Sequence, residues 1–129
     1  MGADIILYPT AIGSGLGGGG DMLTGNDSVD AWRNAMCGHA ACNILPVVAS
    51  NRIGREYMTE SPKVHLDFYG NSFIADHEGQ VVAQAGRDQE EVLIHRVDFD
   101  QVKEYRDSWA VFRDRRPDLY GTLATLDGR

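Results

Sequence analysis

Apolar residues along the chain fall into short continuous runs and into stripes at helical spacing. The longest run, residues 44–49, shows no period-2 alternation, so it predicts a strand with both faces covered, as in layered α/β folds. This strand ends in Ser50, Asn51 and Arg52. Because ligands bind at the carboxyl ends of strands in open α/β sheets, these residues are candidates for a site. An ordinary solvated turn after a core strand is the alternative interpretation.

The N-terminal part combines a strand pattern with a helix pattern. Residues 4–8 predict a short buried strand, whose hydrogen-bond ladder we expect Pro9 to end. A helix capped by Asp27 or Ser28 is expected to run to about residue 42, because apolar side chains recur at helical spacing. These side chains are Val29, Trp32, Met36 and Ala40. Gly38, inside this helix, suggests the close approach of another backbone segment.

The next part of the chain is rich in strand patterns. Residues 55–62 are polar and turn-like. Apolar alternation then predicts strands at 64–75, 80–85 and 92–97. The first two are expected to pair through a hairpin turn at residues 76–79. Each of these strands should have one covered face.

A second helix and an amphipathic tail complete the pattern. Asp98 or Asp100 can cap the helix, and helical spacing continues through Val102, Tyr105, Arg106 and Trp109. The tail at residues 111–120 interleaves arginines with aspartates, which cancels the positive field that a nucleic-acid surface would need. Aromatic anchors beside arginines are typical of a segment that docks on another chain.

Composition narrows the class of protein. The 129 residues are 43% apolar with a formal charge of −7, as expected of one small globular domain. That charge disfavours nucleic acid and anionic membranes as partners, because both need clustered Lys and Arg, but it leaves cationic small molecules compatible. Without an apolar run of membrane-spanning length or a signal-peptide pattern, the expected location is the cytoplasm. Because the chain opens directly into a strand, we expect it to be part of something larger.

Candidate chemistry based on single motifs is weak. Cys37 and Cys42 are too few for a disulfide framework and lack zinc-site spacing, so neither a metal nor a catalytic role is predicted. Both are expected to be small buried thiols. His39 lies two residues from Cys37 and therefore points around the helix away from it. Residues 13–18 match the Gly-x-Gly-x-x-Gly pattern of dinucleotide sites, but glycine continues to residue 20, where a helix should already have opened. A mobile loop is favoured over a cofactor site.

Longer segments carry a more specific signal. They resemble, in order and along nearly the whole chain, the C-terminal part of the nitrilase (carbon-nitrogen hydrolase) superfamily. The matching segments are YPTAIG at 8–13, GHA at 38–40, VASNRIG at 48–54, FYGNSFIA at 68–75, Ser-Trp at 108–109 and RDRRPDLY at 113–120.

The resemblance implies a fold and a chemistry. The implied fold is mixed α/β, the C-terminal half of a four-layer α-β-β-α sandwich, with residues 1–129 forming a partial domain and 100–129 a helical oligomerisation tail. The implied reaction is hydrolysis of a non-peptide C–N bond in an N-carbamoyl amine, such as N-carbamoylputrescine, or a related small amide. The superfamily uses a Glu-Lys-Cys triad, in which a thiolate attacks, a glutamate moves the proton and a lysine stabilises the oxyanion. None of the three matches a position in this chain, and Gly15 stands where putrescine-type members carry an acidic residue.

Three hypotheses follow for the role of the chain. The first is the C-terminal half of an amidohydrolase, whose site an N-terminal segment completes and to which this chain contributes substrate-binding residues. These are Pro9, Thr10, Ala11, Ser50 and Asn51. The second is a catalytically inactive structural or interaction module of the same fold. The third is a nucleotide-binding fragment. Under the first, we expect a homo-oligomer or hetero-assembly, with no cofactor, metal, nucleic acid or membrane involved.

Overall fold

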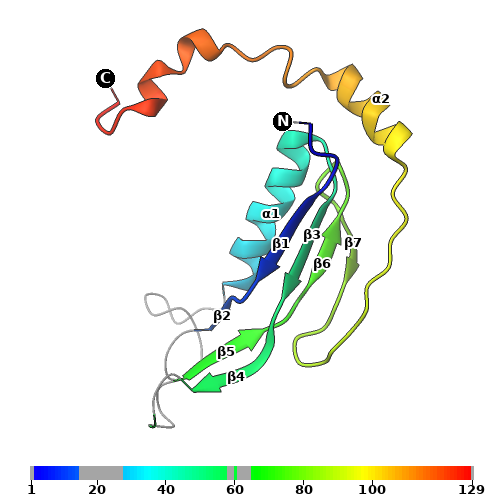
Figure 1. The fold of residues 1–129 in the computed structure, drawn as a ribbon, viewed down its shortest axis with the longest axis vertical. Helices are drawn as coiled ribbons and strands as arrows, with labels where there is room; N and C mark the ends of the chain where they lie inside the picture. Colours follow the sequence, from blue (N-terminus) through cyan, green and yellow to red (C-terminus); the bar gives the residue numbers. More distant parts are fainter. Residues whose placement is uncertain (1, 15–27, 58–59, 61–64, 129) are drawn as a thin grey trace.

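The computed structural model describes residues 2–14, 28–57, 60 and 65–128. Its strands form two sheets (Figure 1). The larger sheet has the order β1-β3-β6-β7, with β1 (Ile6–Thr10) parallel to β3 (Val47–Asn51) and the other pairs antiparallel. The smaller sheet is antiparallel, with the order β2-β5-β4. The remaining strands are β2 (Gly13–Ser14), β4 (Ile53–Tyr57), β5 (His65–Tyr69), β6 (Phe73–Ala75) and β7 (Val81–Gln84).

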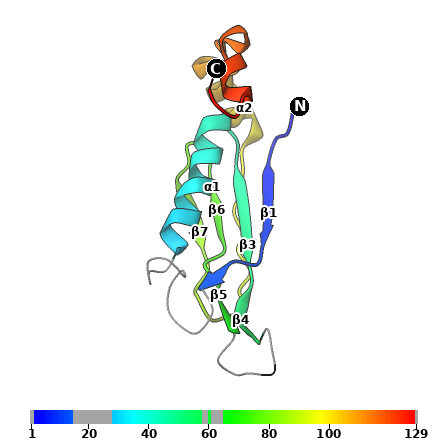
Figure 2. The same cartoon turned by 90° about the vertical axis from the view of Figure 1, so that its left-hand side faces the viewer.

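Helix α1 (Val29–Asn43) covers one face of the larger sheet (Figure 2). Its apolar stripe delivers Trp32 and Ala40 to the core, as the helical spacing predicts. Trp32 stands edge-on to Phe73 of β6, with ring centroids 5.3 Å apart. Val47 and Ala49 of β3 lie under the helix and are essentially inaccessible to solvent. This single helix-on-sheet contact buries most of the core.

The opposite face of the larger sheet is only partly covered. Leu7 of β1 is 64% exposed, and its register partner Val48 is half-buried. The expectation that both faces of the β3 strand are covered is therefore wrong for the described residues. The face toward α1 is sealed, and the other presents apolar side chains to solvent because no second layer within the described part of the chain lies over Leu7.

The C-terminus of α1 differs from the sequence prediction. Residues 44 and 45 do not open the strand, because the helix continues to Asn43 and Ile44 adopts a left-handed conformation with φ of 48°. The amides of Ile44 and Leu45 donate back to the carbonyls of Ala41 and Ala40, in the manner of a helix C-terminal motif. The strand therefore begins only at Val47.

Three further predictions, about Gly38, Gly13 and Pro9, are corrected. Apart from the backbone of α1 itself, no atom of the described residues lies within 4 Å of where a Cβ on Gly38 would stand, so among them no other backbone segment approaches this glycine closely. Gly13, by contrast, forms part of β2 instead of a mobile loop, because a Cβ there would meet the Asp67 carbonyl of β5 at 2.2 Å. Residues 15–20 of the expected loop lie outside the described residues. Pro9 lies within β1, which tolerates it because β1 is an edge strand.

The strand predicted at residues 64–75 is divided between the two sheets. Gly70 and Asn71 have φ of 56° and 57°, and this left-handed pair bends the chain so that β5 joins one sheet and β6 the other. Residues 53–57, read in part as a turn, form β4, which pairs along its whole length with β5. Residues 92–97 form no strand, since no strand pairs with them in the described part of the chain.

The hairpin turn between β6 and β7 is confirmed. The Asp76 carboxylate accepts from the amides of Glu78 and Gln80 at 3.0 and 2.9 Å, and Gly79 has φ of 83°. An aspartate that accepts from later amides and a glycine at positive φ are the usual means of closing such a turn.

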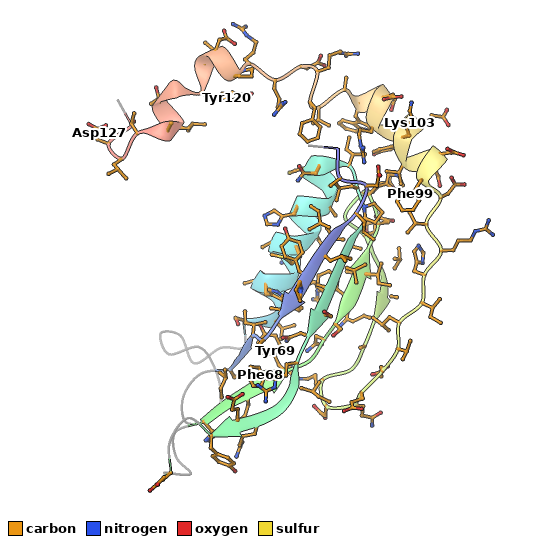
Figure 3. All side chains as sticks on the ribbon, in the orientation of Figure 1. Phe68, Tyr69, Phe99, Lys103, Tyr120 and Asp127 are labelled. Carbon is orange, nitrogen blue, oxygen red and sulfur yellow. The ribbon has the colours of Figure 1, made fainter. Side chains whose placement is uncertain are left out.

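Helix α2 (Phe99–Trp109) begins as predicted at Asp98, whose carboxylate accepts from the amides of Asp100 and Gln101. Arg106 fastens this helix to the end of α1 by two hydrogen bonds to the Ile44 carbonyl, at 3.1 and 2.9 Å. The chain then continues through two short 3₁₀ helices, Pro117–Leu119 and Gly121–Ala124, which extend away from the sheets (Figure 3). No helix in the described ranges has the length and apolarity needed to cross a bilayer.

Candidate functional site

The carboxyl ends of β1 and β3 lie side by side, as the sequence predicts for a site. The parallel register places Pro9 beside Ser50 and Thr10 beside Asn51. Ala11 follows directly, on the way to β2. All five predicted substrate-binding residues therefore lie at one edge of the larger sheet.

Strand alternation nevertheless divides these residues between the two faces. Pro9 and Ser50 are exposed, on the face away from α1. Thr10 and Asn51 alternate with them toward the opposite face and are half-buried. Thr10 turns its hydroxyl back to donate to the Tyr8 carbonyl at 3.0 Å. Of these four residues, only Ser50 has a polar side chain and is exposed on the face away from α1.

Asn51 holds the site together through its amide. Its Oδ1 accepts from the Ile12 amide at 2.9 Å, while its Nδ2 donates to the carbonyls of Ile12 and Gly70 at 3.0 and 2.9 Å. Its backbone amide also donates to Ser72 Oγ. Asn51 therefore ties the end of β3 to the β1–β2 and β5–β6 connections. Both of its amide donors are used in this way, which makes it a positioning residue for the edge.

A cavity of about 490 Å³ lies at this edge. Pro9, Thr10 and Ala11 do not line it, so the structure brings only Ser50 and Asn51 of the predicted set to the cavity wall. The remaining wall comes from three segments of the chain. They contribute Arg52 and Ile53; Gly70 and Ser72; and Ala85, Gly86, Gln89, Glu90 and Glu91.

Charged groups give this cavity an acidic balance. Arg52 is ion-paired with Glu56 and stacks on the Phe68 ring, with its guanidinium carbon 4.4 Å from the ring centroid. Glu91 accepts from the Gly86 amide at 2.7 Å, and Glu90 adds a second carboxylate to the wall. Sequence reasoning missed these two glutamates. Their only signal was the consecutive pair of acids, which nothing in the pattern connects to Ser50.

Gly70 makes the approach of the 85–91 segment possible. A Cβ on Gly70 would stand 2.5 Å from the Arg87 carbonyl and 2.7 Å from the Gly86 carbonyl. The Asn71 amide donates to that Gly86 carbonyl at 2.9 Å. The left-handed bend that separates β5 from β6 therefore also fixes the position of the acidic wall.

The cysteines do not belong to this edge. Cys37 and Cys42 are both free thiols on α1, and burial raises the pKa of Cys37. Cys42 is exposed, which corrects the interpretation of both as small buried side chains. The His39 ring nitrogen Nδ1 is hydrogen-bonded to the Tyr8 hydroxyl at 2.7 Å and is committed to that contact. Among the described residues no three His, Cys, Asp or Glu side chains gather as metal ligands would.

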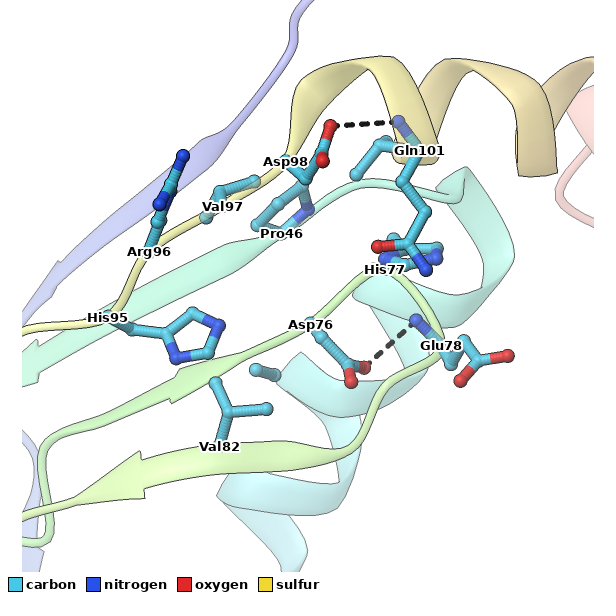
Figure 4. A pocket seen from close by; sticks show the side chains of 12 residues that line it. Pro46, Asp76, His77, Glu78, Val82, His95, Arg96, Val97, Asp98 and Gln101 are labelled. Carbon is cyan, nitrogen blue, oxygen red and sulfur yellow. Dashed lines mark hydrogen bonds between the residues drawn. The ribbon is translucent and has the colours of Figure 1, made fainter.

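A smaller cavity of about 230 Å³ lies at the opposite end of the sheet (Figure 4). Its wall contains Asp76, His77, His95 and Asp98. The two aspartates hold the hairpin turn and the start of α2, so an oxygen of each carboxylate is already committed to backbone amides. We therefore place the candidate site at the Ser50 edge.

Comparison with known proteins decides the family. The sequence profile of the family described as carbon-nitrogen hydrolase matches residues 1–107. The chain belongs to the carbon-nitrogen hydrolase family. The matching segments of the sequence had indicated the same superfamily.

Individual relatives agree with this assignment. The N-carbamoylputrescine amidase of Arabidopsis thaliana is 52% identical over 129 residues, which cover 99% of this chain and 42% of the relative. The citrullinase of Francisella tularensis is 47% identical and covers 95% of the chain and 40% of the relative. The crystal structure of a carbon-nitrogen hydrolase from Helicobacter pylori G27 matches with a TM-score of 0.84 and 34% identity, covering 97% of this chain and 42% of that one. The chain thus spans about two fifths of the length of these relatives, and its mixed α/β architecture is that part of the carbon-nitrogen hydrolase fold.

Proposed function

We propose that this chain is part of an amidohydrolase that cleaves a non-peptide C–N bond of a small N-carbamoyl amine such as N-carbamoylputrescine. The observation that carries the proposal is the 52% identity to an N-carbamoylputrescine amidase along 99% of the chain. The citrullinase relative supports the same chemistry, because citrulline and N-carbamoylputrescine both end in a ureido group. A reaction in polyamine formation, in the cytoplasm, fits such a substrate.

The acidic wall of the Ser50 cavity supports an amine as the distal part of the substrate. Glu90 and Glu91 line this cavity, while Arg52, the one arginine among its described lining residues, is paired with Glu56. A wall with excess carboxylate favours an ammonium group and disfavours a free carboxylate. Putrescine-type members are expected to carry an acidic residue at the position of Gly15. In this chain the carboxylates of Glu90 and Glu91 offer a partner for the cation instead.

In this proposal the chain supplies walls and positioning. Ser50 lines the cavity, Asn51 holds its edge, and Pro9, Thr10 and Ala11 support the neighbouring strand end. The thiolate nucleophile, the glutamate and the oxyanion-stabilising lysine come from protein outside these 129 residues. We propose that burial of the open sheet face and of the C-terminal tail joins this chain to that protein or to further copies of itself.

An inactive structural or interaction module is the second candidate. It is favoured by one observation, the large apolar side chains that the chain leaves exposed, among them Leu7 and Leu123. In that case the same surfaces would be used for assembly without turnover.

A chimera tests which candidate is right. Residues 1–129 replace the matching segment of the Arabidopsis relative, and ammonia release from N-carbamoylputrescine is measured. We expect turnover by the chimera and none by the chain alone, since a catalytic unit without its nucleophile loses most of its rate. Glu90→Gln with Glu91→Gln should raise KM for N-carbamoylputrescine but not for neutral N-carbamoylbutylamine. A folded chimera without activity would favour the inactive module. Turnover by the chain alone that is lost on Cys37→Ala would instead indicate that a thiol of α1 is the nucleophile.

A further inference from the structure

A third cavity, of about 330 Å³, lies far from the Ser50 edge, where α1, the β6–β7 turn and α2 meet. Its walls are mostly apolar or aromatic. They are formed by Ala41, Cys42, Ile44, His77, Glu78, Tyr105, Trp109 and Val111. The volume is within the range of small-molecule sites, which are typically apolar with a few placed polar groups.

Aromatic rings form one side of this cavity. Tyr105 and Trp109, one helical turn apart on α2, have ring centroids 6.1 Å apart and planes tilted by 36°. His77, from the β6–β7 turn, meets the Tyr105 ring edge-on at 5.0 Å. Three rings from two elements thus surround one space, and the faces of Tyr and Trp attract cations because their π-systems are negative.

Among the described residues that line the cavity, the acid Glu78 contributes a carboxylate, and none is Lys or Arg. Desolvation, and after it the neighbouring Glu78 carboxylate, raises the pKa of the Tyr105 hydroxyl. The last turn of α1, which ends at this cavity, carries no basic residue, so the negative end of its dipole adds to the same field.

We propose that this cavity binds a small organic cation, an ammonium group carried on a short apolar body. Glu78 would meet the ammonium, the faces of Tyr105 and Trp109 would flank it, and Ile44, Ala41 and Val111 would cover the apolar part. Such a site is separate from the proposed substrate cavity, because none of its lining residues is shared with the Ser50 edge.

Cys42 provides a reporter in the wall, and Cys37 provides an internal control. Cys42 is exposed and lines the cavity, whereas Cys37, on the same helix, does not line it. The alkylation rate of each thiol in the full chain can be followed by fragment-resolved mass spectrometry with an uncharged maleimide. The probe is 2-phenylethylammonium, and the matched neutral compound is 2-phenylethanol.

We expect 2-phenylethylammonium to slow alkylation of Cys42 in a saturable way and to leave Cys37 unchanged. Glu78→Gln and Trp109→Leu should each weaken this protection by about tenfold. Glu104→Gln, on the same helix but outside the cavity, should bind as the original chain does. Folding of the Trp109→Leu protein is checked by circular dichroism. If it does not fold, the Glu78→Gln variant still tests the proposal, because Glu78 lies at an exposed turn position.

Three results would overturn the proposal. The first is equal protection by 2-phenylethanol, which would mean that the charge is not recognised. The second is protection that survives Glu78→Gln. The third is an alkylation rate of Cys42 that falls as the protein concentration rises, with no 2-phenylethylammonium present. That result would mean that a second copy of the chain covers the cavity.

Discussion

Asn51 shows how one side chain can hold together the backbone around a candidate site. The strand pattern placed it correctly at the end of β3, where we predicted that it binds substrate. Its side-chain amide joins the backbones of Ile12 and Gly70, which belong to connections on either side of it. Ser50, its neighbour, has no such role and lies open on the cavity wall.

The two residues should respond differently to substitution. Asn51→Asp keeps the size of the side chain but replaces both donors with an oxygen that faces two carbonyls. We expect a loss of about 2 kcal/mol in the free energy of unfolding, since each carbonyl loses its partner. Ser50→Ala should change it by less than about 0.5 kcal/mol. Urea unfolding followed by circular dichroism measures both, and equal effects would contradict the positioning role.

At the scale of elements, the β4–β5 ribbon is held by polar pairs. Arg55 and Asp67 are register partners, with Nε donating to Oδ1 at 2.5 Å and Nη2 to Oδ2 at 2.8 Å. His65 Nε2 lies 3.4 Å from the same carboxylate. The hydrogen bond from Arg55 is the main reason that the pKa of Asp67 is lowered. A polar segment can therefore be a strand when its side chains pair across the ladder.

Acid should weaken this ribbon. Because the pKa of Asp67 is lower in the folded chain than in the unfolded one, its contribution to stability is present above the unfolded value, about 3.9. That contribution is lost as the pH falls through the folded value. The difference in melting temperature between the original chain and Asp67→Asn should therefore be small, favour the original chain near neutral pH, and shrink as the pH falls below the unfolded pKa. Asp88→Asn, at an exposed position away from the ribbon, is the control. A difference that does not depend on pH would contradict the prediction.

At the scale of the whole molecule, two apolar surfaces are left open. One is the sheet face with Leu7, 64% exposed, and Ile5, 37% exposed. Val47 and Ala49 of β3 do not belong to this surface, because they lie under α1. The other surface is the tail, where Leu119, Leu123 and other large side chains face solvent. Contiguous exposed apolar surface usually marks an interface.

We predict that the chain does not remain a monomer. Covering about 400 Å² of apolar surface is worth about 10 kcal/mol, comparable with the stability of a small domain. Light scattering over a dilution series should show dimers or larger assemblies. Leu7→Lys and Leu123→Lys should each shift dissociation to higher protein concentration, because each places a charge in one of the two surfaces. A folded monomer at high micromolar concentration would contradict the prediction and favour an independently folded module.

Local rules explain most of what could be predicted from the sequence. The stripe through Trp32 and Ala40, the turn at Asp76 and the cap at Asp98 each depend on residues within one turn of helix or a few positions of chain. Their hydrogen bonds and packing faces are therefore encoded nearby. The edge containing Ser50 also followed from the pattern, because the end of an apolar run is visible without knowing its neighbours. The family followed from long matching segments.

Pairing between distant segments was decided only by the tertiary structure. Whether residues 92–97 form a strand depends on a partner strand, and none pairs with them among the described residues. Residues 65–75 were divided between two sheets by the left-handed bend at Gly70, where a side chain would strike the Arg87 carbonyl. The same approach brought Glu90 and Glu91 to the cavity that Ser50 lines and engaged the backbone amide of Asn71. Such contacts join positions far apart in the sequence, and a pattern read along the chain carries no information about which of them meet.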